Sequence, residues 1–212
     1  MLILAGLGNP GSKYERNRHN LGFLAVDAIA DRFNFRAERS RFQGLVREGS
    51  IPTAGGSETV LILKPQTYMN ESGRSVGEAM HFYKLKPEDV VVFHDELDLA
   101  PGRFRMKTGG GVAGHNGLRS IGSQIGPEFR RARLGIGHPG HKDRVLGYVL
   151  HDFGKEDMAW VKALCDACAE AAPLLAAGED ERYQAEVMRL APAEKMDPRK
   201  AANGPGKGGT AA

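Results

Sequence analysis

Residues 2–22 read LILAGLGNPGSKYERNRHNLG, and the order of the elements in this stretch decides the fold. The apolar run at 2–5 predicts a buried strand, and the glycines that follow it predict a turn. Gly6, Gly8 and Gly11 have the spacing G-x-G-x-x-G, which in dinucleotide-binding proteins leads directly into a helix. The stretch is therefore either a nucleotide-binding turn or a turn that places polar side chains at the end of a strand.

A dinucleotide-binding turn needs a helix that begins inside the glycine motif, so that its N-terminus meets the pyrophosphate. Here Pro10 and Gly11 interrupt the turn, and helical spacing begins only near Asn20, which we expect to cap the helix. An acidic residue should also end a second strand about 20 residues further on. Asp27 and Asp31 instead lie within the helical pattern. The sequence thus argues against NAD binding, and we expect no cofactor.

Strand and helix patterns alternate along the rest of the chain. Strands are predicted near 42–49, 59–65, 89–99, 103–108 and from 129 onward, with a turn-rich segment at 50–58, and helices near 20–33, 72–85, 115–126 and 153–190, the last with a break at Gly178. This alternation predicts an α/β fold: a single three-layer α/β/α domain with a mixed, largely parallel central sheet. The domain should span residues 1–190, and the Gly-, Ala- and Lys-rich residues 191–212 should form a disordered C-terminal tail.

The composition is that of an ordinary globular protein, with 41% hydrophobic and 26% charged residues. No apolar run approaches the roughly 18–20 residues of a membrane helix, and the N-terminus does not have the pattern of a secretory signal. We therefore expect a cytoplasmic protein with no membrane contact. Cys165 and Cys168 form C-x-x-C inside an Ala-rich helical stretch, and no further ligands stand at zinc-site spacing. We expect both cysteines to be reduced and structural, and no metal site.

Positive charge is concentrated in one window of the chain. Residues 103–144 contain nine Lys or Arg and two acidic residues, a net charge of +7, whereas the whole chain carries +3 and the remainder therefore −4. Such asymmetry favours a polyanionic partner on one side of the molecule. On charge alone, a solvated basic face remains the alternative.

Polar side chains stand at the ends of several predicted strands and before the helices. They are Asn9, His19, Asn20, Asn70, Asp95, His115 and Asn116. In open α/β sheets ligands bind beyond the carboxyl ends of the strands, so these groups can gather at one edge, although each alone could equally be a cap or a strand end. The chain has no G-x-S-x-G motif, so a covalent serine mechanism lacks its nucleophile. A histidine oriented by a carboxylate such as Asp95 can instead activate water, and neutral amides can hold a peptide or an oxyanion.

Five motifs, in the same order, resemble those of the bacterial peptidyl-tRNA hydrolases. They read GLGNPG…Y…RHN.G, P.TYMN.SG, V.V.HDELDL..G, K..GG..GHNGL.S and R.R.GIGHPG, and they span about residues 1–190. The resemblance implies hydrolysis of the ester that joins a peptide to the 3′-terminal ribose of tRNA, by histidine-activated water and without a covalent intermediate. It also implies a monomer whose partner is peptidyl-tRNA, recognised by its acceptor stem and its peptide.

The resemblance also assigns roles to single residues. It makes His19 the catalytic base, Asp95 its partner carboxylate, and Asn9, Asn70 and Asn116 the amides that hold substrate and water; Tyr14 and Met69 line the cleft, and His115 is a lower-ranked candidate. Residues 109–117, the gate loop, and the segment after residue 140, the lid, should border the substrate.

For tRNA, the resemblance places Lys107 and Arg133 near the acceptor stem and its 5′-phosphate. Charge alone adds Arg105, Lys142 and Arg144 as weaker candidates. Two other functions stay open at this point. An RNA-binding module of the same fold without hydrolysis would retain the basic window, whereas an esterase of small molecules would leave that window unexplained.

Overall fold

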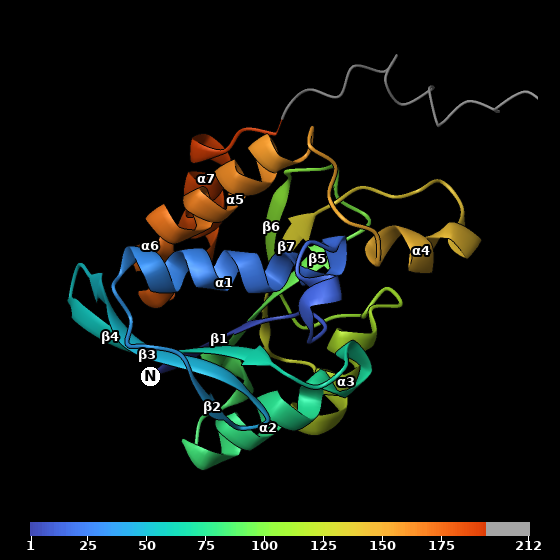
Figure 1. Ribbon diagram of the computed structural model, residues 1–212. Coiled ribbons are helices and arrows are strands. Elements are labelled where there is room, and N and C mark those ends of the chain that lie inside the picture. The colour runs from blue at the N-terminus through green and yellow to red at the C-terminus, as the bar shows by residue number, and fades with distance from the viewer. Residues whose placement is uncertain (194–212) are drawn as a thin grey trace, which may run out of the picture.

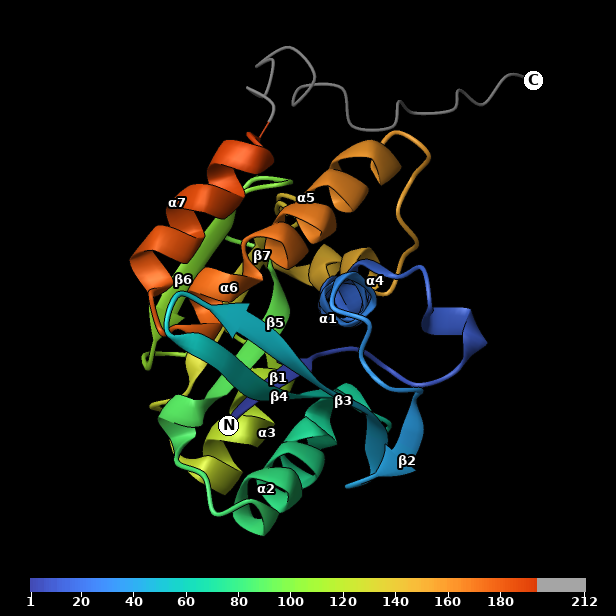
Figure 2. The same cartoon turned by 90° about the vertical axis from the view of Figure 1, so that its left-hand side faces the viewer.

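The computed structural model describes residues 1–193, in which a seven-stranded sheet lies between two layers of helices (Figures 1 and 2). The strands are β1 (Leu2–Gly6), β2 (Arg39–Arg41), β3 (Gly44–Thr53), β4 (Gly56–Pro65), β5 (Val90–Glu96), β6 (Phe104–Thr108) and β7 (Arg130–Gly135). Their order across the sheet is β2-β3-β4-β1-β5-β7-β6. The four central strands are parallel, and the strands at both edges pair antiparallel. The predicted mixed α/β sheet is confirmed.

The helices cover both faces of this sheet. They are α1 (Leu21–Arg32), α2 (Ser72–Phe82), α3 (Asn116–Ile125), α4 (Val145–Val149), α5 (Met158–Glu170), α6 (Ala172–Ala176) and α7 (Asp180–Leu190). Figure 1 shows α1 and α5–α7 above the sheet, α2 and α3 below it, and α4 projecting to one side. Three short 3₁₀ turns matter for the site: η2 (Arg18–Asn20), η3 (Met69–Glu71) and η5 (Lys142–Arg144). Within residues 1–193, no helix combines the length and apolar character needed to cross a bilayer.

Each face of the sheet has its own hydrophobic core, because both faces are covered by helices. In β1, Leu2 and Leu4 pack into the core under α1 and α5, whereas Ile3 and Ala5 pack into the core over α2 and α3. This is why the strand reads as a continuous apolar run. Cys165 and Cys168 are free and buried in the first core, as expected, and burial raises the pKa of both thiols.

The opening stretch folds as a strand, a long turn and a late helix. α1 begins at Leu21, well after the glycine motif, so the helix does not start where a nucleotide-binding turn would need it. Asn20 was expected to cap α1, but its side chain makes no capping bond; its Oδ1 accepts the backbone N–H of Asn9 at 2.9 Å and its Nδ2 donates to the Asn9 carbonyl at 3.0 Å. This pair of hydrogen bonds fixes Asn9 at the end of β1.

Two boundaries predicted from the sequence need correction, and part of the predicted tail lies outside the described residues. The segment at 50–58 is not a loop between strands, because β3 and β4 extend through it and form a hairpin that turns at 54–55. In the predicted tail, Ala191 is buried at the end of α7, and residues 194–212 lie outside the described part of the chain.

Replacing Gly22 by alanine is expected to destabilise the fold, since a Cβ there would lie 2.3 Å from the Phe93 carbonyl oxygen and 2.5 Å from the Leu7 nitrogen. Overpacking of this kind costs about 1–3 kcal/mol. Gly122→Ala is the matched control, because this glycine also lies in a helix and a Cβ there meets nothing within 4 Å. That variant should gain up to about 1 kcal/mol from helix propensity. Urea unfolding followed by circular dichroism measures both, and equal midpoints for the two variants would contradict the close approach.

Candidate active site

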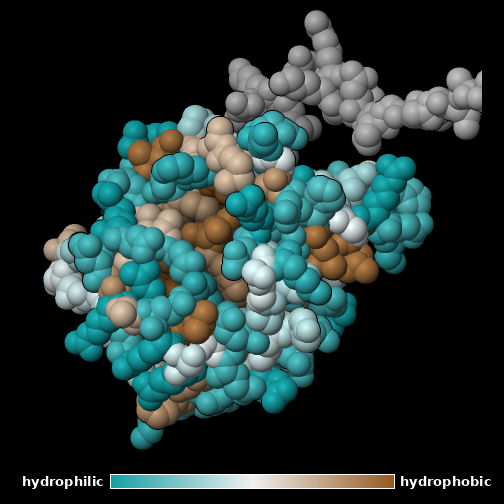
Figure 3. Space-filling model, viewed as in Figure 1, coloured by the Kyte–Doolittle hydropathy of each residue, from teal (hydrophilic) through white to brown (hydrophobic). Residues whose placement is uncertain are grey.

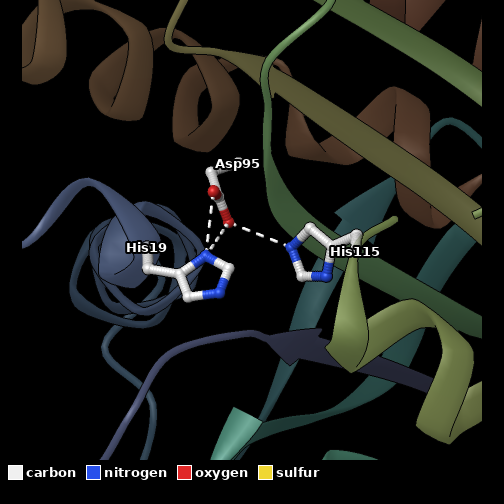
Figure 4. Close-up of side chains that lie close together, drawn as sticks. All are labelled: His19, Asp95 and His115. Carbon is white, nitrogen blue, oxygen red and sulfur yellow. Dashed lines mark hydrogen bonds and ion pairs between the residues drawn. The ribbon is translucent and has the colours of Figure 1, made fainter. Parts of the chain in front are cut away.

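A histidine and a carboxylate meet at the carboxyl edge of the sheet, where α1 faces β5 (Figure 4). His19 lies in the η2 turn that precedes α1, and Asp95 is near the end of β5. The Nδ1 atom of His19 is 2.9 Å from both carboxylate oxygens of Asp95. The Asp95 side chain is only 2% exposed, whereas that of His19 is 13% exposed. The pair therefore has a buried carboxylate and a histidine that reaches the surface of the site.

A second histidine, His115, binds the same carboxylate from the other side. It caps the N-terminus of α3, where its Nδ1 accepts the backbone N–H groups of Gly117 and Leu118 at 3.2 and 3.4 Å. Because Nδ1 accepts, the proton of the neutral ring must be on Nε2, which donates to Oδ1 of Asp95 at 3.0 Å. Asp95 thus accepts hydrogen bonds from two imidazole rings.

This arrangement sets the protonation of His19. Burial would raise the pKa of Asp95, but its electrostatic interactions and hydrogen bonds with His19 and His115 outweigh it and hold that pKa well below its usual range. The ionised carboxylate draws the His19 proton to Nδ1 and leaves Nε2 as a lone-pair acceptor. Burial lowers the pKa of His19, yet the charge and hydrogen bond of Asp95 raise it more, so its pKa lies above the ordinary value of 6.5.

The amide residues are placed around this pair in different ways. Asn9 is buried, and its Oδ1 accepts the backbone N–H of Met69 at 2.8 Å, so its NH₂ group is the part left to donate. Asn70 and Asn116 are exposed, and Asn116 Oδ1 accepts from Arg119 at 3.1 Å. Met69 is placed differently from the expectation: its side chain is 5% exposed and packs in the core, because the absent side chain of Gly117 leaves room for its sulfur.

A cavity of about 420 Å³ opens beside His19 and Asp95. Its lining comes from the end of β5, from gate-loop residues 112–116 and from the lid, and includes Leu97, His138, Lys142, Leu146 and Val149. Leu146 is 69% exposed, and Figure 3 shows apolar side chains on the surface over α4. Tyr14 is half-buried and does not line this cavity. The Nζ atom of Lys13 lies 4.6 Å from the centroid of the Tyr14 ring. The cavity therefore joins an apolar wall to the histidine–carboxylate pair.

The predicted cations divide into two groups. β6 and β7 pair Arg105 with Arg133 and Lys107 with Arg131, so all four side chains share one face of the sheet. Lys107 and Arg133 line a second pocket of about 230 Å³ beside the gate loop. Lys142 and Arg144 lie apart from them, exposed in the η5 turn of the lid, where Lys142 borders the first cavity.

Three residues that the sequence did not single out belong to the site. Glu96 forms an ion pair with Arg133 at 2.9 Å. His94 is fully buried, and burial together with the nearby His115 lowers its pKa to about 3, so it stays neutral. Arg131 is buried between the gate loop and Phe129. The two-residue periodicity of a strand could have pointed to Arg131, because it lies two residues before Arg133 and therefore on the same face of the sheet.

His19, Asp95 and His115 each offer one ligand atom within 4.8 Å of the others, which is close enough for a shared cation. Both ring nitrogens that face Asp95 nevertheless donate hydrogen bonds to it, so the three groups are organised as a proton-holding network. The fold and this network define a class: an α/β protein with a carboxylate-oriented histidine placed to act as a general base.

Comparison with known proteins identifies the family. The sequence profile of the family described as peptidyl-tRNA hydrolase matches residues 3–196, and the chain belongs to this family. It is 69% identical to the peptidyl-tRNA hydrolase of Phenylobacterium zucineum over 98% of this chain and 100% of that protein. It is 64% identical to that of Caulobacter vibrioides over 95% and 98%. The crystal structure of peptidyl-tRNA hydrolase from Acinetobacter baumannii matches with a TM-score of 0.82 and 41% identity, covering 88% of this chain and 94% of that one.

Proposed function

We propose that this chain hydrolyses peptidyl-tRNA at the ester between the peptide and the 3′-terminal ribose, with His19 as the general base. One observation carries the assignment of the base: Asp95 holds the Nδ1 proton of His19, which leaves Nε2 as a proton acceptor on the cavity side. Family membership supports the reaction and the substrate. The RNA-binding alternative without hydrolysis is not favoured, because the catalytic pair is complete.

The reaction follows from the positions of these groups. Nε2 of His19 takes a proton from water, and the resulting hydroxide attacks the ester carbonyl. Charge develops on the carbonyl oxygen, and the NH₂ groups of Asn9 and Asn116 are the neutral donors available to it. Collapse of the tetrahedral intermediate breaks the bond to the ribose oxygen, which takes the proton from His19. The products are a free peptide acid and a tRNA with its 3′-terminal hydroxyl restored.

The catalytic groups all come from one chain, which supports the proposal that the monomer is the active unit. The substrate is a product of translation, and on this ground we place the protein in the cytoplasm. Light scattering tests the first point, with a single-chain mass of 22.9 kDa as the expected result. A stable dimer would contradict it.

Turnover of an N-acetylated aminoacyl-tRNA is the direct test of the proposed function. We expect the native protein to release the N-acetyl amino acid, and to do so faster than with a simple ester that lacks the tRNA. Binding of the tRNA without release would support the RNA-binding module instead. Equal rates on the simple ester would favour an esterase of small molecules.

Lys107→Ala is expected to raise KM for the tRNA substrate, because this exposed lysine lies on the cationic face of β6 and β7. Each lost phosphate contact should reduce the slope of log kcat/KM against log salt by about 0.7–0.9. Steady-state kinetics at several salt concentrations measures the slope. Lys162→Ala, on an exposed lysine of α5, is the matched control. An unchanged slope in Lys107→Ala would remove this residue from the tRNA contact.

A further inference from the structure

Arg131 is a buried cation without a carboxylate partner among the described residues. Arg131 is only 2% exposed. The Cζ atom of its guanidinium lies 4.7 Å from the centroid of the Phe129 ring. The two arginines beside it are ion-paired, Arg130 with Asp180 and Arg133 with Glu96. Buried charges are normally paired, so the contacts that Arg131 makes instead call for an explanation.

Those contacts hold the first part of the gate loop. The two terminal nitrogens of Arg131 donate to the carbonyls of Gly111 at 2.7 Å and Gly110 at 2.9 Å. Lys107 contacts the same segment, since a Cβ at Gly110 would lie 2.7 Å from its Cε. Lys107 is also the cross-strand neighbour of Arg131. A candidate RNA-phosphate ligand and the loop anchor therefore both lie against Gly110.

The far end of the same loop carries part of the catalytic network. The backbone N–H of His115 donates to the Val112 carbonyl at 2.8 Å, and its ring donates to Asp95, which orients His19 (Figure 4). Only Val112 and the two residues after it separate the carbonyls held by Arg131 from His115. A change in how firmly Arg131 holds the loop can thus reach the catalytic carboxylate through a short connection.

The charges give this connection a direction. Arg105, Lys107, Arg131 and Arg133 are four cations on one face. Burial and, after it, the nearby charge of Arg133 lower the pKa of Arg131, whereas the charges of Glu128 and Glu96 raise it. A phosphate bound by Lys107 and Arg133 would offset this repulsion. The guanidinium would then be better stabilised where it donates to the loop carbonyls.

We propose that Arg131 is a positioning residue that couples binding of an RNA phosphate at Lys107 and Arg133 to the alignment of His115, Asp95 and His19, through the gate loop. This inference rests on the proposed function, which it deepens by making the tRNA body a determinant of kcat as well as of KM. Arg131 itself touches neither the ester nor the attacking water.

The test compares two synthetic substrates, an N-acetyl-aminoacyl acceptor-stem hairpin with a 5′-phosphate and the same hairpin without it. For the native protein we expect the phosphate to raise kcat about 5-fold or more, the usual lower range of coupling between sites. Arg131→Lys keeps the charge but loses the two-pronged donation to Gly110 and Gly111. In that variant the phosphate should still lower KM but should no longer raise kcat. Arg130→Lys, in the same strand but facing Asp180, is the matched control and should keep the effect on kcat.

A second readout does not depend on turnover. The ¹⁵N shift of the His115 Nε2–H group should move when the 5′-phosphorylated hairpin, carrying no amino acid, is added to the native protein or to Arg130→Lys, but not in Arg131→Lys. The proposal is overturned if Arg131→Lys loses the same factor in kcat on both hairpins, which indicates only a structural role, or if the phosphate changes only KM in the native protein. A native protein that cleaves neither hairpin would overturn the proposed function, while the shift of His115 would still decide the coupling.

Discussion

His19→Ala is expected to lower kcat by about 100- to 10,000-fold, the usual contribution of a positioned general base. In this variant only solvent hydroxide can supply the nucleophile, since the Nε2 acceptor is gone. The residual rate should therefore rise with pH across the whole measured range. N-acetyl-aminoacyl-tRNA turnover under saturating substrate measures both the loss and the change in pH dependence.

The native protein should behave differently. Because the pKa of His19 lies above 6.5, its base form is incomplete at neutral pH, and kcat should rise with pH to a plateau above that pKa. His81→Ala, an exposed histidine at the end of α2, controls for loss of an imidazole and should stay within about threefold of native. A near-native plateau in His19→Ala would refute His19 as the base.

The sequence predicted most of the fold because the strongest patterns lie where packing is simplest. Strands buried on both faces read as continuous apolar runs, and the late start of the helical pattern near residue 20 was enough to set aside dinucleotide binding. The extension of β3 and β4 across 50–58 was missed, because Pro52 and two glycines read as a loop. β2 pairs only with residues 44–46 of β3, so Pro52 lies on a part of β3 that is paired on one side only. Such an edge position tolerates proline where a central strand does not.

Part of the site could be predicted residue by residue, and part could not. His19 and Asp95 stand in motifs, and the structure brings them to hydrogen-bonding distance. Asn20 looked like a helix cap, but its side chain is used by Asn9, which local propensity does not reveal. Arg131 could not be distinguished from the other cations of the basic window. Its contacts depend on the pairing of β6 with β7 and on a loop that turns back over these strands.

Asp95→Asn is expected to lower kcat by about 1,000- to 10,000-fold, although the side chain keeps its size, because a donor NH₂ group replaces one of the two acceptor oxygens that face the histidines. His115 is fixed as an Nε2–H donor by the two backbone groups on its Nδ1. The amide oxygen must therefore take the place of Oδ1, which faces His115. This puts the NH₂ group in the place of Oδ2, 2.9 Å from Nδ1 of His19. The Nδ1 atom of His19 then accepts, its proton moves to Nε2, and the base is lost.

Two measurements separate this tautomer effect from simple loss of charge. Removing the carboxylate also removes the cause of the raised pKa of His19, so the midpoint of the residual pH–rate profile should move to lower pH. In the double variant Asp95→Asn with His115→Ala, the amide is free to turn its oxygen toward His19. That variant should lose no more activity than Asp95→Asn alone, a strongly non-additive result.

Asp89→Asn provides the control for the same substitution next to the opposite end of β5, where the carboxylate accepts only the Lys86 backbone N–H among residues 1–193. It should change the free energy of unfolding slightly and leave kcat within about threefold. Additive losses in the double variant would mean that His115 does not set the amide orientation. Asp95 would then contribute to catalysis only as a nearby negative charge. The non-additive outcome would instead show that His115 acts on catalysis through the one carboxylate that both histidines share.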